Sequence, residues 1–229
     1  MRSPRGRTRP LCAAFALALC AAAPPAIATS DFLADVLTER GGAGWGMVTR
    51  FEQSPYRGGG VRFDLLPIYL YEGEYVYLHS YRAGLKFNFG SDKRVDAFLS
   101  RRLESYPVEE VPASLAGMSS RIPETDFGLS YEQHFDWGNV YGEALRDVSH
   151  NSGGAELRLG AGTERRRGRL RLVPYPMLSA RNAPLNNYYY GVMPSEATAD
   201  RPAYQPGAGV NGTAGLNARY NLTDRWYLL

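Results

Sequence analysis

Cysteine is almost absent from this sequence of 229 residues, and its two cysteines, Cys12 and Cys20, both lie within the first 28 residues. That segment has the three parts of a secretory signal peptide: four arginines, an apolar run from Leu11 to Ala23, and the small residues Ala26-Ile27-Ala28. We expect cleavage after Ala28, which removes both cysteines. Disulfides and thiolate metal sites are then excluded from the mature chain.

An alternative fate for the segment is lipid anchoring at Cys20, but Leu19 stands where a lipoprotein site needs a small residue. Cleavage also changes the charge, because all four charges of the signal are arginines. Lys+Arg falls from 26 to 22 against 23 Asp+Glu, so the mature chain has a net charge of −1. This balance gives no indication of nucleic-acid binding.

Long apolar runs are also missing after Ala28, so the sequence predicts no transmembrane helix. Histidine is scarce: His79, His134 and His150 show no metal-ligand spacing, and no paired-carboxylate motif accompanies them. We therefore predict no catalytic, cofactor-binding or metal-binding residues, no cofactor, and no enzymatic activity.

What the mature chain does have is a period of two. In Glu74–Phe89, apolar residues occupy one parity and polar or small residues the other from Tyr81 onward, which predicts a single strand of 16 residues. This length suits a tilted strand that crosses a bilayer. Further strands are expected at 126–132, 155–162 and 214–222, and weaker ones at 44–52, 61–71, 94–101, 140–148 and 169–180.

Two architectures accommodate many alternating strands: a soluble sandwich that buries the apolar face, and a membrane barrel that turns this face to lipid. Two features favour the barrel. Lys, Arg, Glu and Gly share the polar faces, as in a wet lumen. Tyrosines and tryptophan gather near expected strand ends, where an interfacial girdle lies, at positions 69, 71, 75, 77, 188–190, 226 and 227.

Several motifs resemble the MipA/OmpV family of outer-membrane proteins. They are Pro55-Tyr56-Arg57-Gly58 with Leu65-Leu66-Pro67; Glu124-Thr125-Asp126-Phe127-Gly128; and Tyr189-Tyr190-Gly191-Val192 followed by Glu196-Ala197 and Tyr204-Gln205-Pro206-Gly207-Ala208-Gly209. The resemblance implies an all-β, antiparallel up-and-down transmembrane barrel of about 10–12 strands when complete. It also implies a location in the outer membrane of a Gram-negative bacterium.

The same resemblance gives the expected organisation and role. Residues 1–28 are the signal peptide and residues 29–229 the barrel, whose last strands we expect to be missing because the family continues beyond Leu229 to a terminal aromatic residue. At least one family member is a scaffold between a murein hydrolase and a murein synthase. Outer-membrane lipid and peptidoglycan enzymes are therefore the expected partners, with no nucleic acid.

A scaffold or adaptor for cell-envelope proteins is thus the predicted function. A passive small-solute channel is the alternative, since Arg, Lys and Glu would line the lumen. A lipid-modifying hydrolase is third, because His150 and Ser152 lie near Asp147. These residues more simply form a polar hairpin turn, since a triad is defined by geometry and not by proximity in sequence.

Two other segments are candidates for binding. The arginines at 165, 166, 167, 169 and 171 suit phosphate or anionic glycan, or form a solvated hairpin tip. Gly58-Gly59-Gly60 precedes no helix and is expected to be a plain loop. Arg181–Val210 is too long and aromatic for a simple turn and is a candidate contact surface. If Glu74–Phe89 is one strand and the N-terminus is periplasmic, strand counting places Glu104–Thr125 and Arg181–Val210 in the periplasm, whereas a turn at residues 80–82 reverses this.

Overall fold

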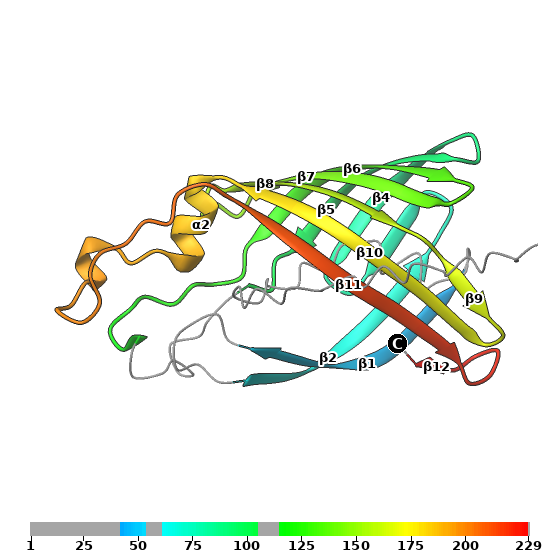
Figure 1. Ribbon diagram of the computed structural model, residues 1–229, viewed down its shortest axis with the longest axis horizontal. Coiled ribbons are helices and arrows are strands. Elements are labelled where there is room, and N and C mark those ends of the chain that lie inside the picture. Colours follow the sequence, from blue (N-terminus) through cyan, green and yellow to red (C-terminus); the bar gives the residue numbers. More distant parts are fainter. Residues whose placement is uncertain (1–41, 54–60, 105–114, 229) are drawn as a thin grey trace, which may run out of the picture.

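The chain forms a single, strongly curved antiparallel sheet (Figure 1). A computed structural model describes residues 42–53, 61–104 and 115–228. The predicted signal peptide and the glycine loop at 58–60 lie outside the described residues. Within the described ranges, no helix is both long and apolar enough to cross a membrane.

The sheet has 12 strands, in the order of the chain except for β9, which extends the pairing of β10. The strands are β1 (Ala43–Gln53), β2 (Val61–Glu72), β3 (Val76–His79), β4 (Arg82–Phe89), β5 (Lys93–Arg101), β6 (Thr125–Phe135), β7 (Gly138–Asp147), β8 (Ala155–Gly162), β9 (Arg165–Arg167), β10 (Leu170–Arg181), β11 (Gly209–Asn221) and β12 (Tyr227–Leu228). All of the expected strands except Glu74–Phe89 are confirmed as single strands, most within two residues at each end. Because the elements form one sheet and not two packed sheets, the sandwich alternative is wrong.

The single strand predicted over Glu74–Phe89 is also wrong, because a hairpin turn at Ser80 and Tyr81 divides it into β3 and β4. Ser80 has a φ of 51°, which is a turn conformation. A two-residue turn pairs His79 with Arg82, so the inward parity changes from odd to even. Tyr77 concealed this change, because it is an inward residue whose ring looks like part of the apolar face.

Burial in the sheet is the reverse of that in a soluble protein. In β4, Arg82 and Lys86 are 5% and 6% exposed, whereas Leu85 and Phe87 are both 48% exposed. The same inversion recurs along the sheet: Glu143, Glu156 and Arg158 are buried, while Leu129, Leu157 and Leu159 are exposed. A surface of leucine and aromatic side chains is stable against lipid and not against water.

The aromatic girdle is only partly as predicted. Tyr69, Tyr75 and Trp226 are exposed near strand ends, where aromatic residues meet the membrane interface. Tyr77 and Tyr189 are each 1% exposed, so neither belongs to an outward girdle.

Glycines pair with aromatic rings across neighbouring strands inside the sheet. Phe98 lies opposite Gly128, and a Cβ placed on Gly128 would come within 2.1 Å of the Phe98 ring. Tyr141 covers Gly160 in the same way, at 2.4 Å. The rings therefore lie flat over backbone that has no side chain, which lets large residues fit a strongly curved inner face.

The two ends of the sheet differ (Figure 1). At one end the connections are turns of two to five residues, as between β6 and β7. At the other end lie the connections 102–124 and 182–208 and the helix α2 (Ala183–Tyr190). The helix was not expected. Asn182 accepts a hydrogen bond from the Leu185 amide as the N-cap, and Pro184 is in the first turn.

Candidate functional site

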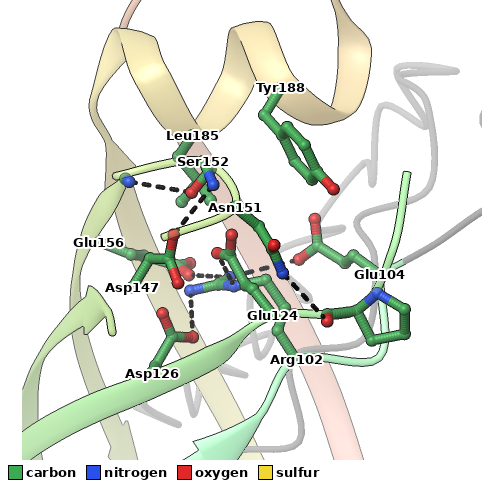
Figure 2. A network of polar contacts seen from close by, with 12 residues as sticks. Arg102, Glu104, Glu124, Asp126, Asp147, Asn151, Ser152, Glu156, Leu185 and Tyr188 are labelled. Carbon is green, nitrogen blue, oxygen red and sulfur yellow. Dashed lines mark hydrogen bonds and ion pairs between the residues drawn. The ribbon is translucent and has the colours of Figure 1, made fainter. Parts of the chain in front are cut away.

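Arg102 is the centre of a buried network of charges at the long-loop end of the interior (Figure 2). It follows β5 directly and is 6% exposed. Its guanidinium lies 2.6 Å from Glu156 and 2.8 Å from Asp126. The carboxylates of Glu124 and Glu104 are at 3.0 and 3.5 Å. One arginine thus holds carboxylates from the starts of β6 and β8 and from the long connection after β5.

The network reaches across the curved sheet. Arg82 of β4 donates to Glu143 of β7 at 2.8 Å, although β5 and β6 lie between these strands. Arg158 of β8 continues the chain, at 3.4 Å from Glu143 and 2.8 Å from Glu156. Such contacts are possible only because the inner face is strongly concave. Arg82 also lies over Phe98, with its guanidinium carbon 3.2 Å from the ring centroid.

A second arginine ties the network to the long connections. Arg181, at the end of β10, makes a two-pronged contact with Glu104 at 2.7 and 2.9 Å. It also donates to Glu156 at 3.2 Å, and Tyr190 of α2 donates to Glu104 at 3.2 Å. The connections after β5 and β10 are therefore joined to each other through charge-assisted hydrogen bonds.

Glu124 lies just before β6 and has an unusual proton affinity. Burial raises its pKa to about 7, while contacts with Ser152 and Arg102 oppose the shift and the carboxylates of Asp126 and Asp147 add to it. Glu124 therefore binds a proton more readily than an exposed glutamate does. A proton here reduces the repulsion among carboxylates that outnumber the arginines around it.

A smaller group of charges lies farther along the interior. Lys86 and His79 both bind the Glu72 carboxylate, the histidine at 2.6 Å. Arg94 pairs with Asp96 at 3.2 Å and with Glu132 at 3.0 Å. The interior is therefore occupied by paired charge over much of its described length.

The long connections also clasp each other outside the strands. Arg121 pairs with Glu196 at 2.8 Å, and the two side chains are each 3% exposed. Burial by itself raises the pKa of Glu196, but hydrogen bonds from Arg121 and from the backbone N–H groups of Ser119 and Met193 lower it to about 2. Glu196 therefore stays ionised, and the pair fastens residues 119–121 to residues 193–196.

Asp147 organises a turn and not a catalytic triad. Its carboxylate accepts from the backbone amides of Ser149, Ser152 and Gly153. The Ser152 hydroxyl accepts from the Gly154 amide at 2.9 Å. His150 has a φ of 62° in an exposed turn position, and among the described residues no histidine bonds Ser152. This arrangement agrees with the polar-turn interpretation.

The other sequence candidates lie at opposite ends of the sheet. The arginine cluster forms β9 and the start of β10 at the short-turn end, where Arg166 and Arg171 pair with Glu164 at 2.6 Å each. The segment 181–210 is at the long-loop end. There Asn186 and Asn187 bind the backbone of Gly207.

The sequence did not identify the network residues as a site. They were recognised only as generic lumen charge, since Arg102 and Glu104 lie after the strand in which alternation is readable. A partial signal was present, because Glu124, Asp126 and Glu196 belong to motifs that carried the family resemblance. Chemically, paired arginines and carboxylates hold structure, and in the described part of the chain no group of His, Cys, Asp or Glu side chains could hold a metal ion.

Comparison with known proteins identifies the family to which the chain belongs. A model of the family described as MltA-interacting protein MipA matches residues 42–229. The outer membrane protein OmpV of Vibrio cholerae is 31% identical over 113 residues, which are 49% of this chain and 44% of OmpV. The outer membrane protein YiaT of Escherichia coli K12 is 26% identical over 148 residues, 64% of this chain and 60% of YiaT.

Omp26La of Vibrio anguillarum, also an outer membrane protein, matches at 31% identity over 113 residues. The chain spans about half the length of these curated relatives. No solved structure matches it. With the family match over most of the chain and a barrel-like sheet that turns leucine outward and charge inward, the chain belongs to the MipA/OmpV family of outer-membrane proteins of Gram-negative bacteria.

Proposed function

We propose that this protein is a non-enzymatic scaffold that holds a peptidoglycan-remodelling enzyme at the periplasmic end of its barrel. The family is named for interaction with MltA, which supports an enzyme of that kind as the partner. The observation that carries the proposal is the interior network, because paired charges that join strands across the inner face favour rigidity over transport.

Sidedness is part of the proposal. Outer-membrane barrels have short periplasmic turns and longer extracellular loops. The connections 102–124 and 182–208 lie at the same end of the sheet, and turns of two to five residues lie at the other (Figure 1). The short-turn end, with the β6–β7 turn and β9, is then the periplasmic end that meets the enzyme.

The channel is the second candidate, because arginine, lysine and glutamate do line the interior. Ion pairs join β4 to β7 and Arg102 to β8 across the inner face, where a solute in the interior would have to pass. Moving an ion past them would break contacts that stabilise buried charge. We therefore expect planar bilayers to show no large, ion-selective steps, and such steps would favour the channel.

A pull-down tests the scaffold. The folded protein in detergent is mixed with a purified lytic transglycosylase of the MltA type, and capture of the enzyme is measured. We expect capture to be lost when the short-turn end carries a bulky label at Asp136→Cys, and kept with the same label at Ser195→Cys at the opposite end. Equal capture with both labels contradicts the proposed docking end, and no capture by the unlabelled protein contradicts the scaffold.

The third candidate function, a lipid-modifying hydrolase, is tested by substitution of Ser152. Ser152 holds the turn after β7 through its backbone and hydroxyl contacts. We expect Ser152→Ala to leave any envelope phenotype intact. Loss of a lipid-modifying activity in this variant would restore the enzyme hypothesis.

A further inference from the structure

A pocket of about 270 Å³ opens at the short-turn end of the sheet. It lies between the β6–β7 turn and the segment that leads through β9 into β10. Its lining includes His134, Trp137, Asn139, Glu164, Arg165 and Arg171, above the buried Val173. The volume is slightly below that of pockets for drug-sized ligands, so it suits one ring with short substituents.

The lining combines aromatic, acidic and basic groups. Phe135 and Trp137 stack nearly parallel, at 8° and 5.7 Å between centroids, and are 46% and 54% exposed. Their faces and edges give an apolar platform with affinity for the C–H face of a sugar ring. Asp136 and Glu164 accept hydrogen bonds, whereas Arg165 and Arg171 donate them.

The charge around the pocket favours an anionic ligand. The hairpin that forms one wall of the pocket carries five arginines, at positions 165, 166, 167, 169 and 171, of which Arg165 and Arg171 line the pocket with the carboxylates of Asp136 and Glu164. Glu164 is already engaged by Arg166 and Arg171 at 2.6 Å. A bare phosphate would meet the two carboxylates unfavourably. A ligand with hydroxyl groups and one acidic group can use both the carboxylates and the arginines.

We propose that this pocket binds an anionic saccharide, and that its source is the glycan strand of peptidoglycan. Where the stem peptide has been removed from the strand, the muramic acid unit carries a free lactyl carboxylate beside ring hydroxyls, which matches arginine next to hydroxyl-binding carboxylates. The short-turn end faces the periplasm in the orientation proposed above, where this glycan lies. Binding of the polymer itself is independent of enzyme capture, so the two proposals can fail separately.

Calorimetric titration of the folded protein in detergent tests the site. The probe is the disaccharide N-acetylglucosaminyl-N-acetylmuramic acid, and the matched control sugar is diacetylchitobiose, which lacks the lactyl carboxylate. We expect the muramic acid disaccharide to bind at least tenfold more tightly than diacetylchitobiose. Equal affinities, or no binding of the disaccharide, would overturn the proposal.

Variants locate the site. Arg165→Gln and Trp137→Ala are each expected to weaken disaccharide binding about tenfold or more. Arg225→Gln, an exposed arginine in the β11–β12 turn outside the pocket, should leave it unchanged. Equal binding by all three variants would place the ligand elsewhere and overturn the assignment.

A third probe separates the two sources of anionic saccharide. The phosphorylated core oligosaccharide of lipopolysaccharide, freed of lipid, offers the same class of chemistry from the cell surface. We expect it to bind more weakly than the muramic acid disaccharide. Tighter binding of the core oligosaccharide would overturn the assignment to peptidoglycan.

Discussion

The positive charge of Arg102 compensates the negative charge of more buried carboxylates than that of any other described residue. Four carboxylate groups lie within 3.5 Å of its guanidinium. Its neighbour Arg101 is exposed on the outer face of β5 and makes one side-chain hydrogen bond, to Thr125 at 3.4 Å. Two adjacent arginines of identical chemistry therefore occupy opposite environments.

We predict that Arg102→Met lowers the free energy of unfolding by about 3–5 kcal/mol, because it leaves buried carboxylates uncompensated. Arg101→Met should have little effect, since an exposed pair contributes little. Urea unfolding in phospholipid vesicles, followed by tryptophan fluorescence, measures both. Similar losses for the two variants would mean that the network does not stabilise the fold.

The Arg121–Glu196 pair predicts that the contact between residues 119–121 and residues 193–196, called the loop clasp below, depends on pH. The folded pKa of Glu196 is about 2, below the value of about 4.3 for an unperturbed glutamate. A lowered carboxyl pKa contributes stability that is complete above the unperturbed value and is lost as pH falls toward the folded one. The clasp should therefore loosen between about pH 4.3 and pH 2.

A spin label at Ser195→Cys measures this, because the chain from Thr29 onward has no other cysteine. We expect low mobility above pH 5 and increasing mobility as pH falls toward 2. In Glu196→Gln the label should be mobile at every pH. A wild-type label that stays immobile at pH 2 would show that the clasp does not depend on this carboxylate.

The aromatic–glycine pairs are a property of neighbouring strands. The Phe98 ring occupies the space that a side chain at position 128 needs, and the contact repeats in β7 and β8. These pairs align β5 with β6 and β7 with β8 while the inner face curves. Overpacking at such a contact forces a ring off its preferred rotamer or displaces a strand.

We predict that Gly128→Ala destabilises the protein by about 1–3 kcal/mol. Gly46→Ala is the matched control, because a Cβ on Gly46 meets nothing within 4 Å. The double variant Phe98→Ala/Gly128→Ala should lose less than the sum of its single variants, as residues in contact are coupled. Additive losses in urea unfolding would contradict a direct ring–glycine contact.

For the whole molecule, the separation of short and long connections predicts orientation in the membrane. A membrane-impermeant maleimide should label Ser195→Cys in intact cells. Asp136→Cys should be labelled only after the outer membrane is permeabilised. The reverse pattern would place the β6–β7 turn outside and contradict both proposals for the short-turn end.

Most strand positions were predictable from the sequence, because a spanning strand must keep one face apolar and the other polar along its length. Strand β8 was predicted at its observed bounds, Ala155–Gly162. The prediction of a single strand over Glu74–Phe89 was wrong for a specific reason. Tyr77 has an apolar ring with a hydroxyl that accepts from Arg82, so its inward position could not be read from residue type.

The sequence by itself determined the class of protein, an all-β outer-membrane protein. The features that determined it are the alternating apolar face of the strands and the family motifs along the chain. Which charges meet was decided only by the tertiary structure. Arg82 and Glu143 are 61 residues apart, and Arg121 and Glu196 are 75 apart. Contacts of this kind depend on the curvature of the whole sheet and on how two long connections fold over its end, and residue periodicity carries neither.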